Sequence, residues 1–412
     1  MAAFSNRKTC GTIEVSHLRI LTPDREAPVH NARKFLCDLE SAKKESRLKV
    51  IRAIMCNPGN QADLAKRTGL SVATVSVAAR GMIKEGIITE TTKRELRINK
   101  AATGVAVGVS VGLRQVTVAS RLVHEAPNQT RFRRIDLGVS GGDEWMTETA
   151  NAIHEIVGKI GEHRSDIVTI GMGVPWSVDP RTLMPGGPAP PWADSRPIGK
   201  LVAEKLTHPP DDEIKVVVET DARVAALYEQ TYNYPYETLL FVQISAHVLG
   251  GQLQGPLLHK GADGSATNVG HLKADFAGKD CWCGERGCLE RYVNSSILLE
   301  EAFVKCRAQQ TEPPMSIEQL IARAEAHDPI CLEVLRSAAA QLSRVLIEAS
   351  KMAKTHAIVI GGTVAPGLAL VLNRGNRDLD RSEWTRKIRL HFGDVDSSAQ
   401  GALLFGLTSH LH

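Results

Sequence analysis

Four potential soft metal ligands lie within eighteen positions of this chain, and no other feature limits its fold as strongly. They comprise one imidazole and three thiolates: His271, Cys281, Cys283 and Cys288. Such a set suits a closed, tetrahedral structural zinc far better than Mg²⁺ or Ca²⁺. Gly284 and Gly287 allow the tight backbone path that brings three sulfurs to one ion, because glycine reaches positive φ without a Cβ clash. We expect one structural Zn²⁺ here, and the alternative is a cluster of buried or disulfide-bonded cysteines.

Length and composition indicate a multidomain protein that works in the cytoplasm. A chain of 412 residues with 43% hydrophobic content suggests two or three domains. There is no run of about eighteen apolar residues to cross a membrane, and the N-terminus lacks the apolar stretch of a signal peptide. The remaining cysteines are scattered, as expected for reduced thiols rather than a disulfide framework. We therefore expect a cytoplasmic location and no membrane partner.

Basic charge is concentrated near the N-terminus. Residues 31–100 hold 15 Lys and Arg against 7 Asp and Glu, whereas the rest of the chain holds 35 against 39. Clustered cations neutralise phosphates, so this asymmetry points to a nucleic-acid-binding segment on a near-neutral body. A merely solvated basic face is the alternative.

The pattern inside that basic segment is typical of a helix-turn-helix. Leu48, Ile51 and Ile54 or Met55 recur at helical spacing before Asn57-Pro58-Gly59 ends the helix. A second helix is expected at about 61–67 and a third at about 72–84, capped by Ser71, with Val75, Ala79 and Ile83 as its inner face. The alternative is a three-helix packing or dimerisation module without DNA contact.

In a helix-turn-helix, outward side chains near the start of the second helix of the pair meet base edges in the major groove. The candidate readers are Val72, Ala73, Thr74, Ser76 and Arg80. Two alternating stretches, 86–90 and 95–98, predict a β-wing with Lys93 and Arg94 at its tip. We expect a homo-oligomer, either a dimer or a tetramer. Its symmetry-related recognition helices would bind a palindromic operator.

From Gly104 the chain has the alternation of apolar strands and helical stretches that is typical of an α/β fold. Strands are expected at 105–111, 167–173, 215–218, 239–244 and 357–360. Glycine-rich turns are expected to follow several of them, at 171–173, 250–251 and 361–362. We therefore divide the chain into a candidate disordered extension over 1–30, a winged helix-turn-helix over 31–100 and an α/β body over 101–412.

The pattern GH(x)9CxCGxxGCxE, which starts at Gly270, resembles the zinc motif of the ROK family of sugar kinases and sugar-responsive transcriptional regulators. The resemblance covers roughly Gly104 to the C-terminus. It implies a two-lobed actin-like (ribonuclease H-like) ATPase/sugar-kinase fold with a sugar between the lobes. The basic segment resembles the winged helix that precedes this body in the regulators and is missing from the kinases.

Several residues correspond to the family's sugar contacts, although two of them differ from the family pattern. Asp221 matches the catalytic base and Glu290 a sugar-contacting Glu, whereas Thr220 replaces an Asn and Asn268 replaces a Glu. The resemblance also places His271 beside the sugar, and the stretch 186–192 matches the loop that closes over it. It therefore implies that an effector binds at Thr220, Asp221, Asn268, His271 and Glu290. A neutral amide at 268 could accept an acidic or acylated group.

The phosphate-binding loops of the family are degenerate here. The first reads Ser-Val-Gly-Leu-Arg at 110–114 and the second reads Ser-Ala-His-Val-Leu-Gly-Gly at 245–251. Side chains such as His247 and Leu249 would crowd the approach of a phosphate to backbone amides. The leading hypothesis is a transcriptional regulator, specifically a repressor of carbohydrate genes, with no enzymatic activity. The alternatives are an ATP-dependent sugar kinase with an added DNA-binding domain, and a constitutive DNA-binding protein whose body only dimerises it.

Overall fold

The computed structural model describes residues 43–100, 104–113, 115–137, 144–159, 167–187, 193, 196–206, 214–235, 238–372 and 387–409. The expected extension over 1–30 and the expected start of the winged-helix domain lie outside these ranges. So do residues 188–192 of the stretch that matches the family's sugar-closing loop. None of the helices in the described ranges is both long and apolar enough to cross a lipid bilayer.

The N-terminal described segment is a winged helix-turn-helix, as predicted. A helix over 43–56 is followed by α2 (Gln61–Thr68) and α3 (Val72–Lys84). Strands β1 (Ile88–Glu90) and β2 (Leu96–Ile98) pair antiparallel and form the wing. One detail of the prediction was wrong: Met82 is buried on the inner face of α3, whereas Ile83 is 37% exposed. The inner face follows the row of residues at 75, 78, 79 and 82.

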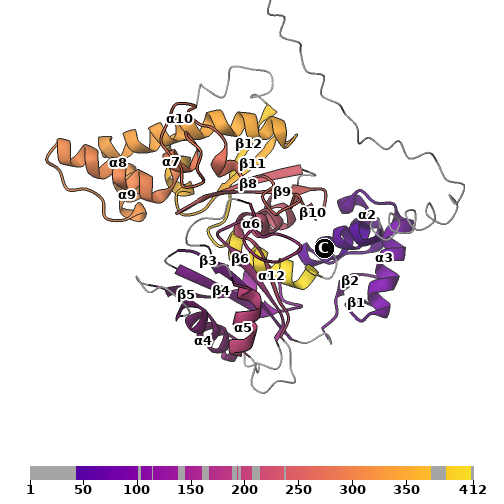
Figure 1. Ribbon diagram of the computed structural model, residues 1–412. Coiled ribbons are helices and arrows are strands. Elements are labelled where there is room, and N and C mark those ends of the chain that lie inside the picture. The colour runs from indigo at the N-terminus through magenta and orange to yellow at the C-terminus, as the bar shows by residue number, and fades with distance from the viewer. Residues whose placement is uncertain are drawn as a thin grey trace, which may run out of the picture. The chain divides into compact units, whose positions relative to one another are not determined.

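The first lobe of the body contains a five-stranded mixed sheet. Its strands are β3 (Val105–Val111), β4 (Gln115–Leu122), β5 (Arg131–Asp136), β6 (Ile167–Val174) and β7 (Val216–Thr220), in the spatial order β5-β4-β3-β6-β7. The β3–β4 and β4–β5 pairs are antiparallel, and the β3–β6 and β6–β7 pairs are parallel. Helices α4 (Glu144–Gly158) and α5 (Ile198–Leu206) pack on this sheet (Figure 1).

The second lobe repeats this topology. Its strands are β8 (Thr238–Ile244), β9 (Val248–Gln254), β10 (Leu257–Leu258), β11 (Ala357–Gly361) and β12 (Arg389–Phe392), in the order β10-β9-β8-β11-β12. Strands β8, β9 and β10 form an antiparallel meander. Strand β11 pairs in parallel with β8, and β12 pairs in parallel with β11. The two five-stranded sheets therefore share one plan, which is the α/β architecture expected from the sequence.

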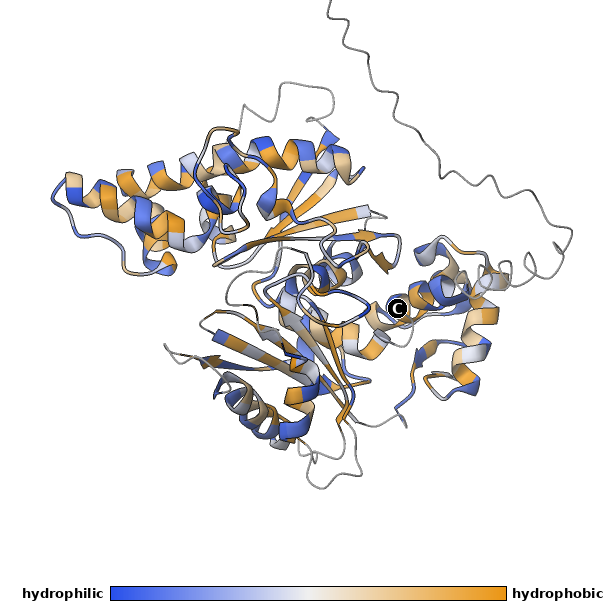
Figure 2. Cartoon of the chain, viewed as in Figure 1, coloured by the Kyte–Doolittle hydropathy of each residue, from blue (hydrophilic) through white to orange (hydrophobic). Residues whose placement is uncertain are grey.

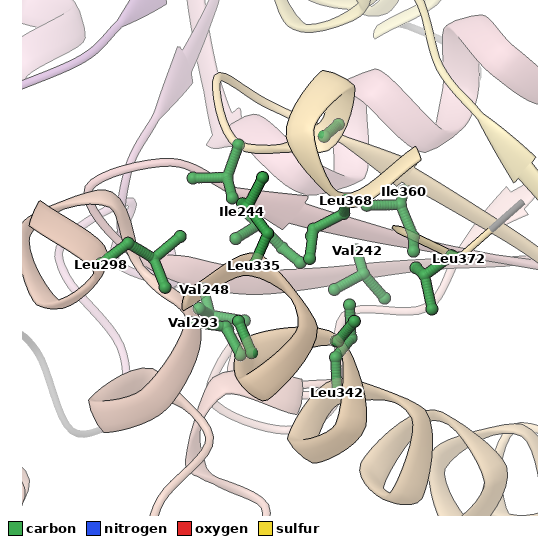
Figure 3. Packing of buried hydrophobic residues seen from close by; sticks show 14 of the residues in the cluster. Val242, Ile244, Val248, Val293, Leu298, Leu335, Leu342, Ile360, Leu368 and Leu372 are labelled. Carbon is green, nitrogen blue, oxygen red and sulfur yellow. The ribbon is translucent and has the colours of Figure 1, made fainter. Parts of the chain in front are cut away.

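Helices bury one face of the second sheet in the largest apolar cluster of the described residues. They are α7 (Glu290–Val293), α8 (Ser295–Ala308), α9 (Ile317–Glu325), α10 (Pro329–Met352) and α11 (Ala365–Leu372). Leu335 and Leu342 of α10 belong to one apolar cluster with Val242 of β8 and Ile360 of β11 (Figure 3). Hydrophobic and hydrophilic residues alternate along α10, whereas the strands beneath it are largely hydrophobic (Figure 2). This pattern places one face of α10 on the sheet and leaves the other to solvent.

Two helices lie between the lobes, and glycines inside the strands let the backbones of these helices approach the sheets closely. Helix α6 (Asp221–Tyr228) packs on β8 and β9, α12 (Ser397–Thr408) packs on β3 and β6, and the two helices pack on each other. A Cβ on Gly171 would lie 1.8 Å from the Ala402 oxygen, and one on Gly251 would lie 2.1 Å from the Ala222 oxygen. The prediction of turns at 171–173 and 250–251 was therefore wrong, because these glycines lie inside β6 and β9.

Candidate metal centre, effector site and DNA interface

The four residues of the cysteine motif come together as one cluster. Their ligand atoms all lie within 4.8 Å of one another. The Cys281 Sγ is 3.7 Å from the His271 Nδ1, and the Cys283 Sγ is 3.8 Å from the Cys288 Sγ. A tetrahedral metal with sulfur ligands at about 2.3 Å would hold two sulfurs about 3.8 Å apart. The cysteines are free thiols, so the disulfide alternative does not apply to them.

Local backbone geometry creates this cluster. His271 ends a short 3-10 turn (Val269–His271), and Cys288 lies two residues before α7. Gly284 and Gly287 have φ values of 90° and 69°, as their predicted role in the tight loop requires. Burial lowers the pKa of His271, which favours the neutral imidazole that binds metals. Burial and the neighbouring thiols raise the pKa of Cys288 to about 12, so a cation would be needed to hold it as a thiolate at neutral pH.

Thr220 and Asp221 lie at the junction of β7 and α6, deep in the body. Their exposed fractions are 1% and 6%. Asp221 is the first residue of α6, and its Oδ1 accepts a hydrogen bond from the Ala222 N–H at 2.6 Å. Burial raises the pKa of Asp221 to about 7, and the Ala222 N–H opposes this only in part. The Thr220 Oγ1 is buried and has no hydrogen-bond partner among the described residues, a costly state that a bound ligand could relieve.

Asn268 and Glu290 both lie near the start of β9. A Cβ on Gly250 would meet the Thr267 oxygen, and one on Gly270 would meet the Val248 oxygen, so the turn at 267–270 rests directly on β9. Within the part of the chain that the structure describes, the Asn268 Oδ1 is buried and has no hydrogen-bond partner. This second orphaned polar atom also suits a polar ligand.

Both carboxylate oxygens of Glu290 already have partners within the protein. Its Oε2 accepts a hydrogen bond from the Val248 N–H at 2.7 Å, and its Oε1 accepts one from the Asn294 Nδ2 at 3.2 Å. The His247 Nδ1 lies 3.6 Å from the same Oε1, and Glu290 is only 2% exposed. Sequence reasoning identified Glu290 but missed Asn294, and it treated His247 only as an obstacle to phosphate. The available signal was an Asn four residues after Glu290, at the junction of α7 and α8.

A buried ion network next to Thr220 was also missed. The Glu219 Oε1 accepts hydrogen bonds from the Thr220 N–H at 2.8 Å and from the Arg223 Nη1 at 2.5 Å. The Glu219 Oε2 pairs with the Lys260 Nζ at 2.9 Å, and Arg223 also donates to the Gly264 oxygen. Glu219 and Arg223 are each 1% exposed, so the network fixes the 260–264 loop against the start of α6. The opposite charges of Glu219 and Arg223, four residues apart across the junction of β7 and α6, were a sequence signal for half of it.

The stretches 110–114 and 245–251 each include a tight turn between paired strands. At the first, the Gly112 N–H donates to the Gln115 oxygen at 2.8 Å, and Arg114 lies outside the described residues. At the second, the Ser245 N–H donates to the His247 oxygen at 2.9 Å. His247 turns towards Glu290, whereas Leu249 packs in the apolar cluster that contains Ala222. The two side chains expected to crowd the loop thus point to different neighbours.

The predicted DNA readers lie on or beside the exposed face of α3. Ser71 caps this helix by accepting a hydrogen bond from the Thr74 N–H at 3.0 Å, and its Oγ lies 2.8 Å from the Thr74 Oγ1. The Thr74 hydroxyl is therefore engaged at the cap. Val72, Ala73 and Arg80 are exposed, and Ser76 is half-buried. Lys93 and Arg94 are exposed in the wing turn, as expected. Val77, which is 55% exposed, belongs to this face and was not identified.

Comparisons with known proteins agree with this architecture. The ROK family model matches residues 106–381, and a model described as winged helix-turn-helix DNA-binding matches residues 43–89. The chain therefore belongs to the ROK family, and it carries an N-terminal winged helix-turn-helix.

Among similar proteins, the xylose repressor of Bacillus subtilis (strain 168) is 24% identical over 392 residues, which cover 91% of this chain and 96% of the repressor. The N-acetylmannosamine kinase of Vibrio cholerae is 28% identical over 204 residues, which cover 48% of this chain and 66% of the kinase.

Solved structures show the same fold. A ROK family transcriptional regulator, a homologue of the E. coli MLC protein, superposes with a TM-score of 0.66 at 19% identity, covering 89% of this chain and 97% of the regulator. A ROK family glucokinase from Streptomyces griseus superposes with a TM-score of 0.62 at 20% identity, covering 74% of this chain and 99% of the glucokinase.

Proposed function

We propose that this protein is a DNA-binding transcriptional repressor of carbohydrate genes whose affinity for its operator changes when a sugar or sugar derivative binds the body. The observation that carries the proposal is the pairing of a winged helix-turn-helix with a sugar-kinase-like body in one chain. The similar kinases align with only part of the chain, whereas the xylose repressor aligns with 91% of it.

The DNA-binding domain in this proposal extends over residues 31–100. Val72, Ala73, Ser76 and Arg80 meet base edges, Thr74 supports the helix cap, and Lys93 and Arg94 contact phosphate from the wing. A cytoplasmic homo-oligomer presents two such readers, so the operator is a palindrome with half-sites spaced by whole helical turns. Selection of bound duplexes from a random-sequence library by the full-length protein tests this. A symmetric motif is expected, and recovery of no enriched sequence would contradict the proposal.

The effector site in this proposal lies in the body, residues 101–412, at Thr220, Asp221, Asn268, His271 and Glu290. Two orphaned polar atoms there, the Thr220 Oγ1 and the Asn268 Oδ1, suit the hydroxyl groups of a sugar. Pentoses are the first candidates because of the similarity to a xylose repressor, and N-acetylated hexosamines are the second because of the similarity to an N-acetylmannosamine kinase. Calorimetric titration of each class into the full-length protein identifies the effector.

We further propose that the cysteine cluster holds a structural Zn²⁺ through His271, Cys281, Cys283 and Cys288. Three thiolates and an imidazole at tetrahedral spacing form a closed set with no open position for catalysis. In this role the ion would stabilise the 271–288 loop, which leads directly into Glu290.

A sugar kinase is the second candidate, because Asp221 is buried with a pKa near 7, which suits a general base. We propose that this activity is absent, since the stretch 110–114 lacks the second glycine of the family's first phosphate loop and the stretch 245–251 lacks three glycines of the second. A coupled assay with ATP and a panel of pentoses and hexoses tests this proposal. Turnover that disappears in Asp221→Asn would establish the kinase instead.

A further inference from the structure

The DNA-facing side of α3 is unusually apolar for a surface that must meet base edges. Val72 is 50% exposed and Val77 is 55% exposed, and Ala73 between them is exposed as well. Isolated exposed apolar residues are ordinary on a protein surface. Here three of them share one side of a single helix, and the same side carries the proposed readers Ser76 and Arg80.

Helical geometry arranges these residues in two adjacent rows. Residues four apart lie one above the other, so Val72, Ser76 and Arg80 form one row and Ala73 and Val77 form the next. The buried row of Val75, Ala78, Ala79 and Met82 packs in the winged-helix core on the opposite side. Neither valine is therefore required by that core.

The polar groups at the start of α3 have local partners. The Ser71 Oγ accepts the Thr74 N–H bond and lies 2.8 Å from the Thr74 Oγ1. Both hydroxyls are thus used to cap the helix. In the first two turns of α3, whose N-terminal residues enter the major groove, Val72, Ala73 and Val77 are exposed, and Ser76 between them is half-buried.

Aliphatic side chains can recognise only one feature of the major groove. Base pairs present hydrogen-bond donors and acceptors there, and thymine alone adds a C5-methyl group. We infer that Val72, Ala73 and Val77 read thymine methyl groups, so that each half-site carries thymines beneath the start of α3. This inference rests on the proposed DNA-binding function and specifies the bases that it selects.

Ser76 and Arg80 complete the surface in this arrangement. Ser76 lies between Ala73 and Val77, and Arg80 extends the same side of α3 towards its C-terminal end, where it can reach a guanine edge or a phosphate. The half-site is therefore expected to place its thymines under the first two turns of the helix, where Ser76 adds one polar contact, and the contact of Arg80 beyond them.

Thymine-to-uracil exchange tests the inference because it removes only the methyl group and leaves base pairing intact. Duplexes selected from a random-sequence library by the full-length protein serve as the probe, with each thymine replaced in turn by deoxyuridine. At one or more thymines in each half-site, the dissociation constant should rise about fourfold per methyl, equivalent to about 0.8 kcal/mol. Val77→Ser and Val72→Ser should each bind the thymine duplex less well and lose the preference for thymine over uracil at a different position.

Val304→Ser is the matched control, since Val304 is 61% exposed on α8 and the change in side chain is the same. It should leave both affinity and thymine preference unchanged. Equal binding of thymine and uracil duplexes would overturn the inference while leaving the DNA-binding function intact. A thymine preference that persists fully in both serine variants would overturn it too. Failure to enrich any duplex would instead remove the DNA-binding function on which the inference depends.

Discussion

The recognition helix and the candidate effector site expose their functional side chains to opposite degrees. On α3, Val72 and Val77 are about half exposed, whereas Thr220, Asp221 and Glu290 have exposed fractions of 1%, 6% and 2%. A side chain on an open face can be changed without altering the core behind it. A buried polar side chain is coupled to stability, because its desolvation is part of the folded state. Variants of α3 should therefore change DNA binding alone, and variants of the effector site should change stability and effector response together.

The largest effect is expected from loss of the metal that we propose beside the effector site. Cys288→Ser removes one of four ligands, and the unfolding free energy should fall by about 4 kcal/mol or more because metal binding is coupled to folding. Cys306→Ser is the control, since Cys306 is also fully buried but lies outside the cluster. Elemental analysis and thermal unfolding check both variants. A Cys288→Ser protein that keeps its metal and its melting temperature would contradict the zinc assignment.

The next-largest effect is a pH dependence of the unfolding free energy that arises from the buried carboxyl of Asp221. Its pKa is raised from 3.8 to about 7 by burial, so between about pH 4 and 7 the folded state holds a proton that the unfolded state has released. The contribution of this protonated carboxyl to the unfolding free energy is fully present below pH 4 and is lost as pH rises through 7. The loss is at most about 4 kcal/mol, taking 1.36 kcal/mol per pKa unit. The unfolding free energy, measured by denaturant unfolding across this pH range, should decline less for Asp221→Asn than for the unsubstituted protein. Identical pH profiles for the two proteins would refute the burial effect.

A smaller effect is expected on the exposed helix. Arg80→Ala should weaken binding to the selected duplex by about 1 to 3 kcal/mol if the guanidinium meets a guanine edge, while thermal stability and effector affinity stay unchanged. Fluorescence anisotropy and calorimetry measure the two affinities. A change in effector affinity equal to the change in DNA affinity would break the proposed separation of the two regions.

The smallest effect is expected at the wing tip. Lys93→Ala removes one exposed cation, so the slope of log affinity against log salt should become shallower by about 1, with similar losses for all sequences. Affinities measured at several salt concentrations test this. A loss confined to one operator sequence would show that Lys93 reads bases rather than phosphate.

The local features of this fold could be predicted from sequence because their contacts are short-range. The cysteine cluster, the helix-turn-helix and the wing each form within about 25 residues, and periodicity or spacing identifies them. Strands β3, β6, β7, β8 and β11 were also predicted from their continuous apolar runs. Strand β5, with the sequence RFRRID, was not, because it is a polar edge strand with no such run.

The contacts of the candidate effector site could be predicted only in part because the partners of its side chains are distant in sequence. Nothing in the stretch around Glu290 shows that its carboxylate bonds Val248, 42 residues earlier. The Arg223 bond to the Gly264 oxygen spans 41 residues in the same way. Glycines 171 and 251 look like turn residues in sequence, and only the packing of α12 and α6 explains why they lie inside strands. Long-range packing decides these details, and a single sequence does not encode it in a readable pattern.

The central claim is that an effector bound in the body changes the affinity of the winged helix for DNA. It is tested most directly by the dissociation constant of the full-length protein for its selected duplex, measured with and without each member of a panel of pentoses, hexoses and N-acetylated hexosamines. At least one sugar should shift that constant by about 5-fold to 150-fold, the usual range of allosteric coupling, and the shift should disappear in a Thr220→Val, Asn268→Ala double variant. A dissociation constant unchanged by the whole panel, or a full shift in the double variant, would contradict the account.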